Sequence, residues 1–147
     1  MADDDASEHW LWRLDAAAWL AAARRELAAA HEQLESRRAC VAHARRAGGM
    51  ACNAVLCAWA QREPERADAI ASVWGRSYVE HLRWLVAGSR GPLPEGVEAL
   101  AKTLLETPMA PPEVIGLGAQ RHADLRRLVD AADGLVTACT DVVRTES

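Results

Sequence analysis

The sequence predicts an all-α protein, an up-and-down antiparallel bundle of about five helices that forms a single domain over residues 1–147. No segment alternates apolar and polar residues with period two, as a half-buried strand would. Apolar residues recur instead at the i, i+3, i+4 spacing of an amphipathic helix. Between residues 47 and 60 the only polar side chain is Asn53, and a helix that is apolar on all sides lies inside a bundle.

Composition narrows the class of protein further. Half of the residues are hydrophobic, which is enough to bury one sizeable core. The net charge of −4 argues against general nucleic-acid binding, which needs a basic surface. Residues 1–6 are acidic rather than basic, so they do not resemble a signal peptide and are expected to be disordered. Because the apolar run over residues 47–60 is also too short to cross a membrane, the sequence predicts a cytoplasmic protein with no membrane partner.

The cysteines and the known metal motifs give no sign of a metal site or cofactor. In the cytoplasm the four cysteines are expected to be reduced thiols, and no CxxC pair occurs. Cys52 and Cys57 are five residues apart, which places them on different faces of a helix, so they are interpreted as small buried apolar residues. Glu-x-x-His, HExxH and the glycine-rich phosphate loop are all absent. The sequence therefore predicts no metal and no cofactor.

The first helix is expected to begin near Ser7. Asp5 and Glu8 have the spacing of a capping box, with Asp in the place of Ser or Thr. Alanine, the strongest helix former, dominates residues 16–30. The expected buried stripe is a leucine every seven residues: Leu20, Leu27 and Leu34.

Three tryptophans lie on the shoulders of their apolar stripes: Trp12, Trp19 and Trp84. Each one fits either the edge of the core or a contact surface for another chain. Because exposed aromatic surface usually marks an interface, the sequence predicts a homodimer at micromolar concentration.

The second helix, from about Ser36 to Gln61, is expected to be the centre around which the others pack. Each glycine of its Gly48–Gly49 pair lowers the stability of the helix by about 1 kcal/mol relative to alanine. A tight crossing with another helix is the plainest compensation, and a ligand that approaches the backbone is the alternative.

Three more helices are expected after it. Pro64 suits the first turn of a third helix, whose apolar stripe continues to Leu85. Glycine and proline predict a loop over residues 88–94, and a fourth helix follows over 94–106. A second loop over residues 107–118 precedes the fifth helix, which is expected over residues 119–143.

Two Arg-x4-His spacings are the only candidates for acid–base chemistry: Arg38 with His43, and Arg76 with His81. Five residues turn a regular helix about 140° beyond a full turn, so the members of each pair point apart. They could cooperate only where the helix bends, as Gly75 would allow before Arg76, or across a dimer. The alternative for each pair is a solvated arginine with a half-buried, hydrogen-bonded histidine.

Residues 39–58, ACVAHARRAGGMACNAVLCA, resemble the most recognisable helix of the HEPN family, named for higher eukaryotes and prokaryotes nucleotide-binding. Residues 18–23 are similar to the first helix of that family, in which Trp-Leu is followed by alanine. Residues 78–82 resemble its His-Asp-Leu segment, with the Asp missing. The likeness extends from about Trp10 to Val143.

The resemblance implies a five-helix, up-and-down bundle that is frequently dimeric. Members are often encoded beside a nucleotidyltransferase and act as a toxin or as its partner. Some are metal-independent ribonucleases that use Arg-x4-6-His at a composite dimer site, which makes Arg76 and His81 the candidate catalytic pair here. Ser77 stands directly after Arg76, where the ribonucleases commonly have Asn, Asp or His.

Three functional hypotheses follow. The preferred one is a non-catalytic HEPN-like module that self-associates and binds a partner protein of the nucleotidyltransferase type, or a nucleotide. The alternative is a metal-independent toxin-type ribonuclease that uses Arg76 and His81 on an RNA substrate. The third is a structural or regulatory bundle without a ligand.

Overall fold

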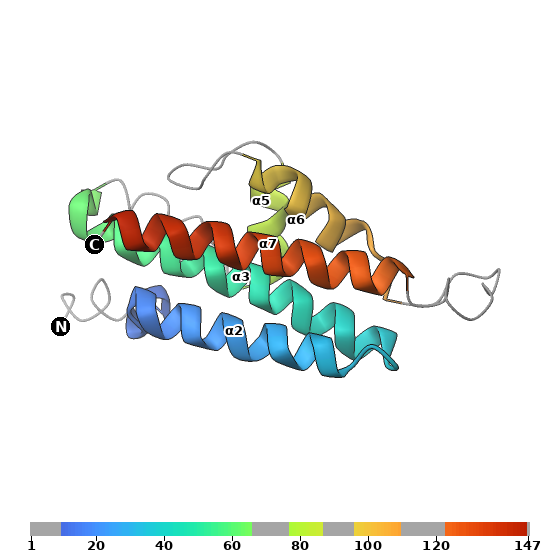
Figure 1. Ribbon diagram of the computed structural model, residues 1–147. Helices are drawn as coiled ribbons and strands as arrows, with labels where there is room; N and C mark the ends of the chain where they lie inside the picture. Colours follow the sequence, from blue (N-terminus) through green and yellow to red (C-terminus); the bar gives the residue numbers. More distant parts are fainter. Residues whose placement is uncertain (1–9, 66–76, 87–95, 110–122, 147) are drawn as a thin grey trace.

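The computed structural model describes residues 10–65, 77–86, 96–109 and 123–146, and all regular structure in them is helical. A short 3₁₀ turn precedes five α-helices: η1 (Trp10–Arg13), α2 (Ala16–Glu32), α3 (Arg37–Arg62), α5 (Tyr78–Val86), α6 (Val97–Glu106) and α7 (Ala123–Glu146). The helices lie together as one bundle (Figure 1). The predicted all-α bundle is confirmed.

Helix α3 is the centre of the bundle, as predicted. It contacts η1, α2, α5, α6 and α7, and residues 51–57 are all buried. Figure 1 shows α3 between α2 and α7. The predicted bounds, Ser36 to Gln61, differ from the observed helix by one residue at each end.

The helices do not simply alternate in direction. Helices α2 and α3 are antiparallel, as are α6 and α7, but α3 and α7 run the same way (Figure 1). Arg37 at the start of α3 accordingly pairs with Asp124 at the start of α7. Helix α5 has only nine residues and lies across the longer helices, so it does not add another full-length reversal.

The first long helix begins later than expected. Residues 10–13 form the 3₁₀ turn, and α2 begins at Ala16, so the predicted start near Ser7 is wrong; the predicted capping box at Asp5 and Glu8 lies outside the described residues. The amide of Ala18 donates to Oδ1 of Asp15 at 2.8 Å, which makes Asp15 the N-cap. A short capping side chain satisfies an amide that a longer helix would have paired with its own backbone.

Trp19 belongs to the core. Its side chain is 6% exposed, and its indole Nε1 donates to the carbonyl of Leu11 at 3.0 Å. The core-edge interpretation is therefore confirmed for Trp19, and the contact-surface interpretation is wrong for it. The side chains of Trp12 and Trp84 lie outside the described residues. The leucine stripe is confirmed, with Leu20 buried and its two successors partly buried against the core.

The third predicted helix is not continuous. Pro64 begins a helical turn as expected, residues 66–76 are outside the described part, and Ser77 is not helical. Helix α5 then begins at Tyr78. The Ser77 hydroxyl accepts from the amide of Glu80 at 3.4 Å, and its carbonyl accepts from the amide of His81 at 3.2 Å. These bonds are typical of a serine that starts a helix rather than continues one.

The last two helices are shifted by a few residues from their predicted bounds. Helix α6 begins at Val97 instead of Pro94, because Gly96 has φ of 86° and cannot belong to a right-handed helix. Helix α7 runs three residues beyond the predicted end at Val143. The predicted loop over 88–94 lies outside the described residues. Of the loop predicted over 107–118, residues 107–109 are described and are not helical, and the rest lies outside the described residues.

The glycine pair marks a tight helix crossing, as predicted. A Cβ atom on Gly49 would lie 2.5 Å from Cδ1 and 2.6 Å from Cβ of Tyr78. A Cβ atom on Gly48 would lie 2.9 Å from Leu104 and 3.0 Å from Leu135. Because side chains of α5, α6 and α7 fill this space, the alternative of a ligand at the glycine backbone is not supported.

Candidate functional site

The predicted catalytic histidine is sealed inside the bundle. His81 is 1% exposed and packs edge-on against the ring of Tyr78, with ring centroids 5.7 Å apart. The expected half-buried state is therefore wrong for His81. Its predicted partner, Arg76, lies outside the described residues. An imidazole that exchanges protons with a substrate must be reached by it, so His81 could act only after the bundle opens.

The helix break also changes the argument about the pair. The expected 140° separation assumes one regular helix from Arg76 to His81, but α5 begins at Tyr78. The separation of about 140° expected for a regular helix therefore does not apply to Arg76 and His81. Burial of His81 replaces it as the physical reason against catalysis.

The second Arg-x4-His pair matches the alternative interpretation. Arg38 is exposed and makes no hydrogen bond among the described residues. The His43 side chain is 26% exposed, and its Nδ1 lies 2.5 Å from Oε2 of Glu26. Solvated arginine and half-buried, hydrogen-bonded histidine are both confirmed here.

Around Glu26 the structure gathers a polar cluster from three helices. We call Glu26, His43, Arg46 and Tyr78 the Glu26 cluster. His43 contacts one carboxylate oxygen of Glu26, while Nη1 of Arg46 lies 3.4 Å from the other. The Glu26 side chain is only 20% exposed, so water screens these contacts less than on an open surface.

Tyr78 belongs to the cluster through its electrostatics. Burial raises the pKa of Tyr78; the Glu26 charge raises it further, and Arg46 opposes that effect. The phenol is therefore a neutral hydrogen-bond donor at physiological pH. Sequence reasoning missed this cluster because Glu26 and Tyr78 lie on helices other than that of His43. No local spacing connects them.

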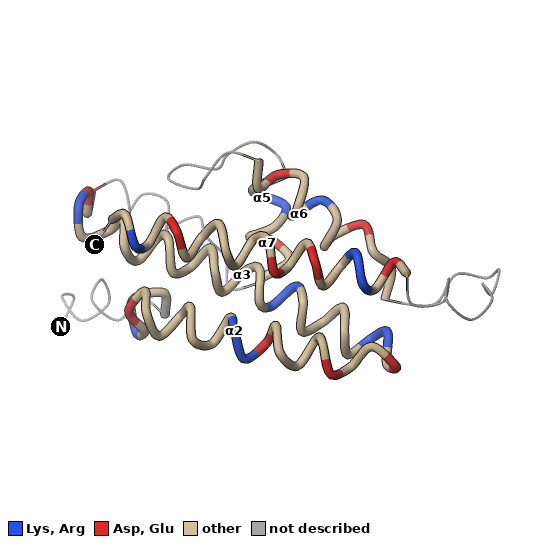
Figure 2. Tube along the Cα trace, viewed as in Figure 1, with Lys and Arg blue, Asp and Glu red and all other residues tan. Residues whose placement is uncertain are grey.

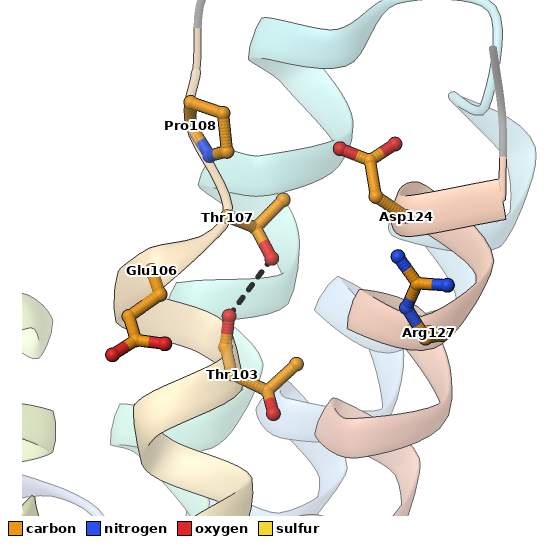
Figure 3. A pocket seen from close by; sticks show the side chains of 6 residues that line it. All are labelled: Thr103, Glu106, Thr107, Pro108, Asp124 and Arg127. Carbon is orange, nitrogen blue, oxygen red and sulfur yellow. Dashed lines mark hydrogen bonds between the residues drawn. The ribbon is translucent and has the colours of Figure 1, made fainter. Parts of the chain in front are cut away.

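A second polar region lies where α6 ends beside the start of α7. Arg37 forms a two-pronged ion pair with Asp124, with both N–O distances 2.7 Å, and donates to the Pro108 carbonyl at 3.1 Å. A hollow of about 230 Å³ opens beside this pair. Figure 3 shows the six residues that line it: Thr103, Glu106, Thr107, Pro108, Asp124 and Arg127.

This hollow is polar but has only modest means of holding a ligand. The Thr107 hydroxyl donates to the Thr103 carbonyl at 2.8 Å, so it is already used. The Arg127 side chain reaches toward the hollow from α7 (Figure 3), beside the acidic Asp124 and opposite Glu106. Arg127 is the one cationic side chain among the six lining residues, and the Asp124 carboxylate beside it is already paired with Arg37.

The Arg37–Asp124 pair gives a pH-dependent prediction. The hydrogen bond from Arg37 lowers the pKa of Asp124 below 3.8, so its stabilisation is present above that pH and is lost as the pH falls through the folded-state value. Asp124→Asn is expected to lower the free energy of unfolding by about 1 kcal/mol at pH 7. Urea titrations at pH 7 and at progressively lower pH should show the difference from wild type shrinking.

Asp130→Asn is the matched control, because Asp130 is exposed on the same helix and has no ion pair among the described residues. It should leave stability nearly unchanged at both pH values. A destabilisation by Asp124→Asn that stays constant down to pH 2 would contradict the ion-pair explanation.

The cysteines are buried thiols, as expected. All four are buried and free. The pKa of Cys52 is raised by its hydrogen bond with Cys139 and, to a lesser extent, by burial. Burial raises the pKa of Cys57 to about 12. The Cys57 thiol donates to the Leu11 carbonyl at 3.3 Å. Within the described ranges, no group of three or more His, Cys, Asp or Glu residues is placed to hold a metal ion.

Comparison with protein-family models, with curated proteins and with solved structures finds no match for this chain. In the part of the chain that the structure describes, no helix is both long and apolar enough to cross a membrane.

Proposed function

We propose that this protein is a non-catalytic, HEPN-like helical module that self-associates and binds a partner protein of the nucleotidyltransferase type, or a nucleotide. The burial of His81 is the observation that carries this proposal. The residue that the resemblance assigns to proton transfer is buried in the core instead, edge-on against Tyr78, which itself lies against Gly49. An imidazole that a substrate cannot reach argues against catalysis by His81.

The charge distribution also supports a binding role. Charges of both signs are scattered along the described helices, and none of these helices carries a continuous basic stripe (Figure 2). Such a surface is unsuited to general binding of nucleic acid. Seven exposed arginines nevertheless make no ion pair among the described residues: Arg13, Arg24, Arg25, Arg38, Arg126, Arg127 and Arg144. A guanidinium fork suits a carboxylate on a protein partner or a phosphate.

A metal-independent ribonuclease is the second candidate, because the helix break at Ser77 favours it. Because α5 begins only at Tyr78, a regular helix does not fix the angle between the side chains of Arg76 and His81. Arg76 would then stabilise charge on the attacked phosphate while His81 moves a proton. This candidate requires His81 to become accessible, for example in a dimer.

Incubation of the purified protein with total RNA, with and without chelator, separates the two candidates. We expect no cleavage under either condition, because His81 is not accessible. His81→Ala is then expected to lower stability without affecting any reaction. Chelator-resistant cleavage that disappears in a folded His81 variant would support the ribonuclease instead.

Two further variants keep this experiment decisive. His81→Asn retains a polar side chain in case the alanine variant does not fold. His31→Ala removes an exposed histidine on α2 and should be neutral. Self-association stays a prediction that sedimentation velocity tests directly, and Trp19 no longer supports it because that side chain is buried.

A further inference from the structure

The Glu26 cluster brings two basic side chains of α3 to one surface position. His43 and Arg46 are three residues apart, so they lie on the same face of the helix. Both contact Glu26, which reaches them from α2. With a protonated imidazole the three side chains carry one net positive charge. Tyr78 adds a neutral donor from α5.

The orientation of His43 follows from its contact with Glu26. Nδ1 is held by the carboxylate at 2.5 Å, and Nε2 lies on the opposite side of the ring. His43 makes no other hydrogen bond among the described residues, and its side chain is partly exposed. Nε2 is therefore the nitrogen that remains for a ligand.

Arg46 is held more loosely than His43. Its single contact with Glu26 is 3.4 Å long, and its side chain is 46% exposed. The other N–H groups of the guanidinium donate to no atom of the described residues. An exposed arginine with a long ion-pair contact loses little stabilisation when it turns toward a second anion.

We propose that His43 and Arg46 together bind one oxyanion of the phosphate class, with Glu26 as a positioning residue that turns Nε2 of His43 outward. The inference rests on the nucleotide branch of the proposed function and identifies the phosphate group as the part that is recognised. Charge-assisted hydrogen bonds from an imidazolium and a guanidinium suit a tetrahedral dianion.

Sulfate is the first probe, because it keeps two negative charges from pH 5 to pH 8. The measurement is the NMR shift of the His43 ring during a sulfate titration, with chloride at matched ionic strength as reference. We expect saturable binding of sulfate at pH 6, with no comparable response to chloride. The carboxylate of Glu26 from α2 contacts the ring, and Arg46 from α3 contacts the same carboxylate.

Variants locate the site. Arg46→Gln should weaken sulfate binding at least about tenfold, because it removes the second cation. Arg38→Gln removes an exposed arginine of the same helix and should leave binding unchanged. Glu26→Gln should alter the ring ¹⁵N shifts of His43, which report the tautomer, even where stability is retained. A response to sulfate that does not saturate, or that survives Arg46→Gln, would overturn the proposal.

Three further ligands distinguish the source of the phosphate: inorganic phosphate, AMP and a short oligoribonucleotide without a terminal phosphate. Binding of phosphate and AMP but not of the oligonucleotide assigns a phosphate monoester. Binding of AMP that is unaffected by Arg46→Gln would overturn this site while leaving the proposed nucleotide-binding function intact. Sulfate binding without AMP binding would support the site and contradict the nucleotide branch.

Discussion

Gly49→Ala is expected to lower the free energy of unfolding by about 1–3 kcal/mol, although alanine is the better helix former. The added methyl group would lie 2.5–2.6 Å from ring and Cβ atoms of Tyr78. Because Cβ of Tyr78 is fixed to its backbone, α5 as a whole must move away from α3. Urea denaturation of the variant and wild type measures the difference, and Gly49→Leu should cost at least as much.

Two other helical glycines provide a graded control. Gly134→Ala on α7 meets only ordinary contacts with Leu100 at 3.4 Å or more, so it should stabilise by about 0.5–1 kcal/mol. Gly48→Ala should fall between them, since the nearest atoms are the flexible ends of leucine side chains. A stabilising Gly49→Ala would show that the crossing is looser than the structure has it.

Arg45→Ala is expected to lower the free energy of unfolding by about 2–4 kcal/mol, because it leaves the carbonyls at the end of α6 without their charged donor. Nε of Arg45 donates to the Leu104 carbonyl at 2.9 Å, and Nη2 donates to the carbonyls of Leu105 and Thr107 at 3.1 and 3.0 Å. Burial lowers the pKa of Arg45, and the nearby Arg83 adds to this effect. Chemical denaturation gives the stability, and hydrogen exchange should show the last turn of α6 opening first.

Arg45→Lys tests the geometry of the guanidinium fork. An ammonium group keeps the charge but cannot reach all three carbonyls from one position, so lysine should recover only part of the loss. Arg38→Ala on the same helix should change stability by less than about 0.5 kcal/mol, because its side chain is exposed and has no described contact. Full recovery by lysine would mean that charge alone matters.

Gly49 also connects the core to the candidate site. Tyr78 lies against Gly49 and, at the same time, senses the charges of Glu26 and Arg46. The absence of a side chain at Gly49 is therefore what allows α5 to bring Tyr78 to the Glu26 cluster. Gly49→Ala should disturb oxyanion binding as well as stability.

The helical elements and the central helix among them could be predicted from the amino-acid sequence. The apolar residues of 47–60 and the glycine pair predicted a buried helix with a close crossing, because such features depend on local composition and periodicity. Inward positions of α6 and α7 were likewise readable from their spacing, as with Leu104, Leu128 and Leu135, all fully buried. Pro64 was correctly placed at the start of a helix.

Tertiary packing decides which polar side chains meet, whereas the starts of α2 and α5 depend on local capping that helix propensity alone does not predict. Asp15 and Ser77 interrupt segments that propensity would continue, because their side chains bond to nearby amides. The parallel direction of α3 and α7 brings Arg37 beside Asp124, residues that are 87 positions apart in the sequence. Glu26 meets His43 across two helices, while His81 turns inward against Tyr78. Spacing along one helix fixes which residues share a face, but the packing of the other helices decides whether that face meets solvent, a carboxylate or the core.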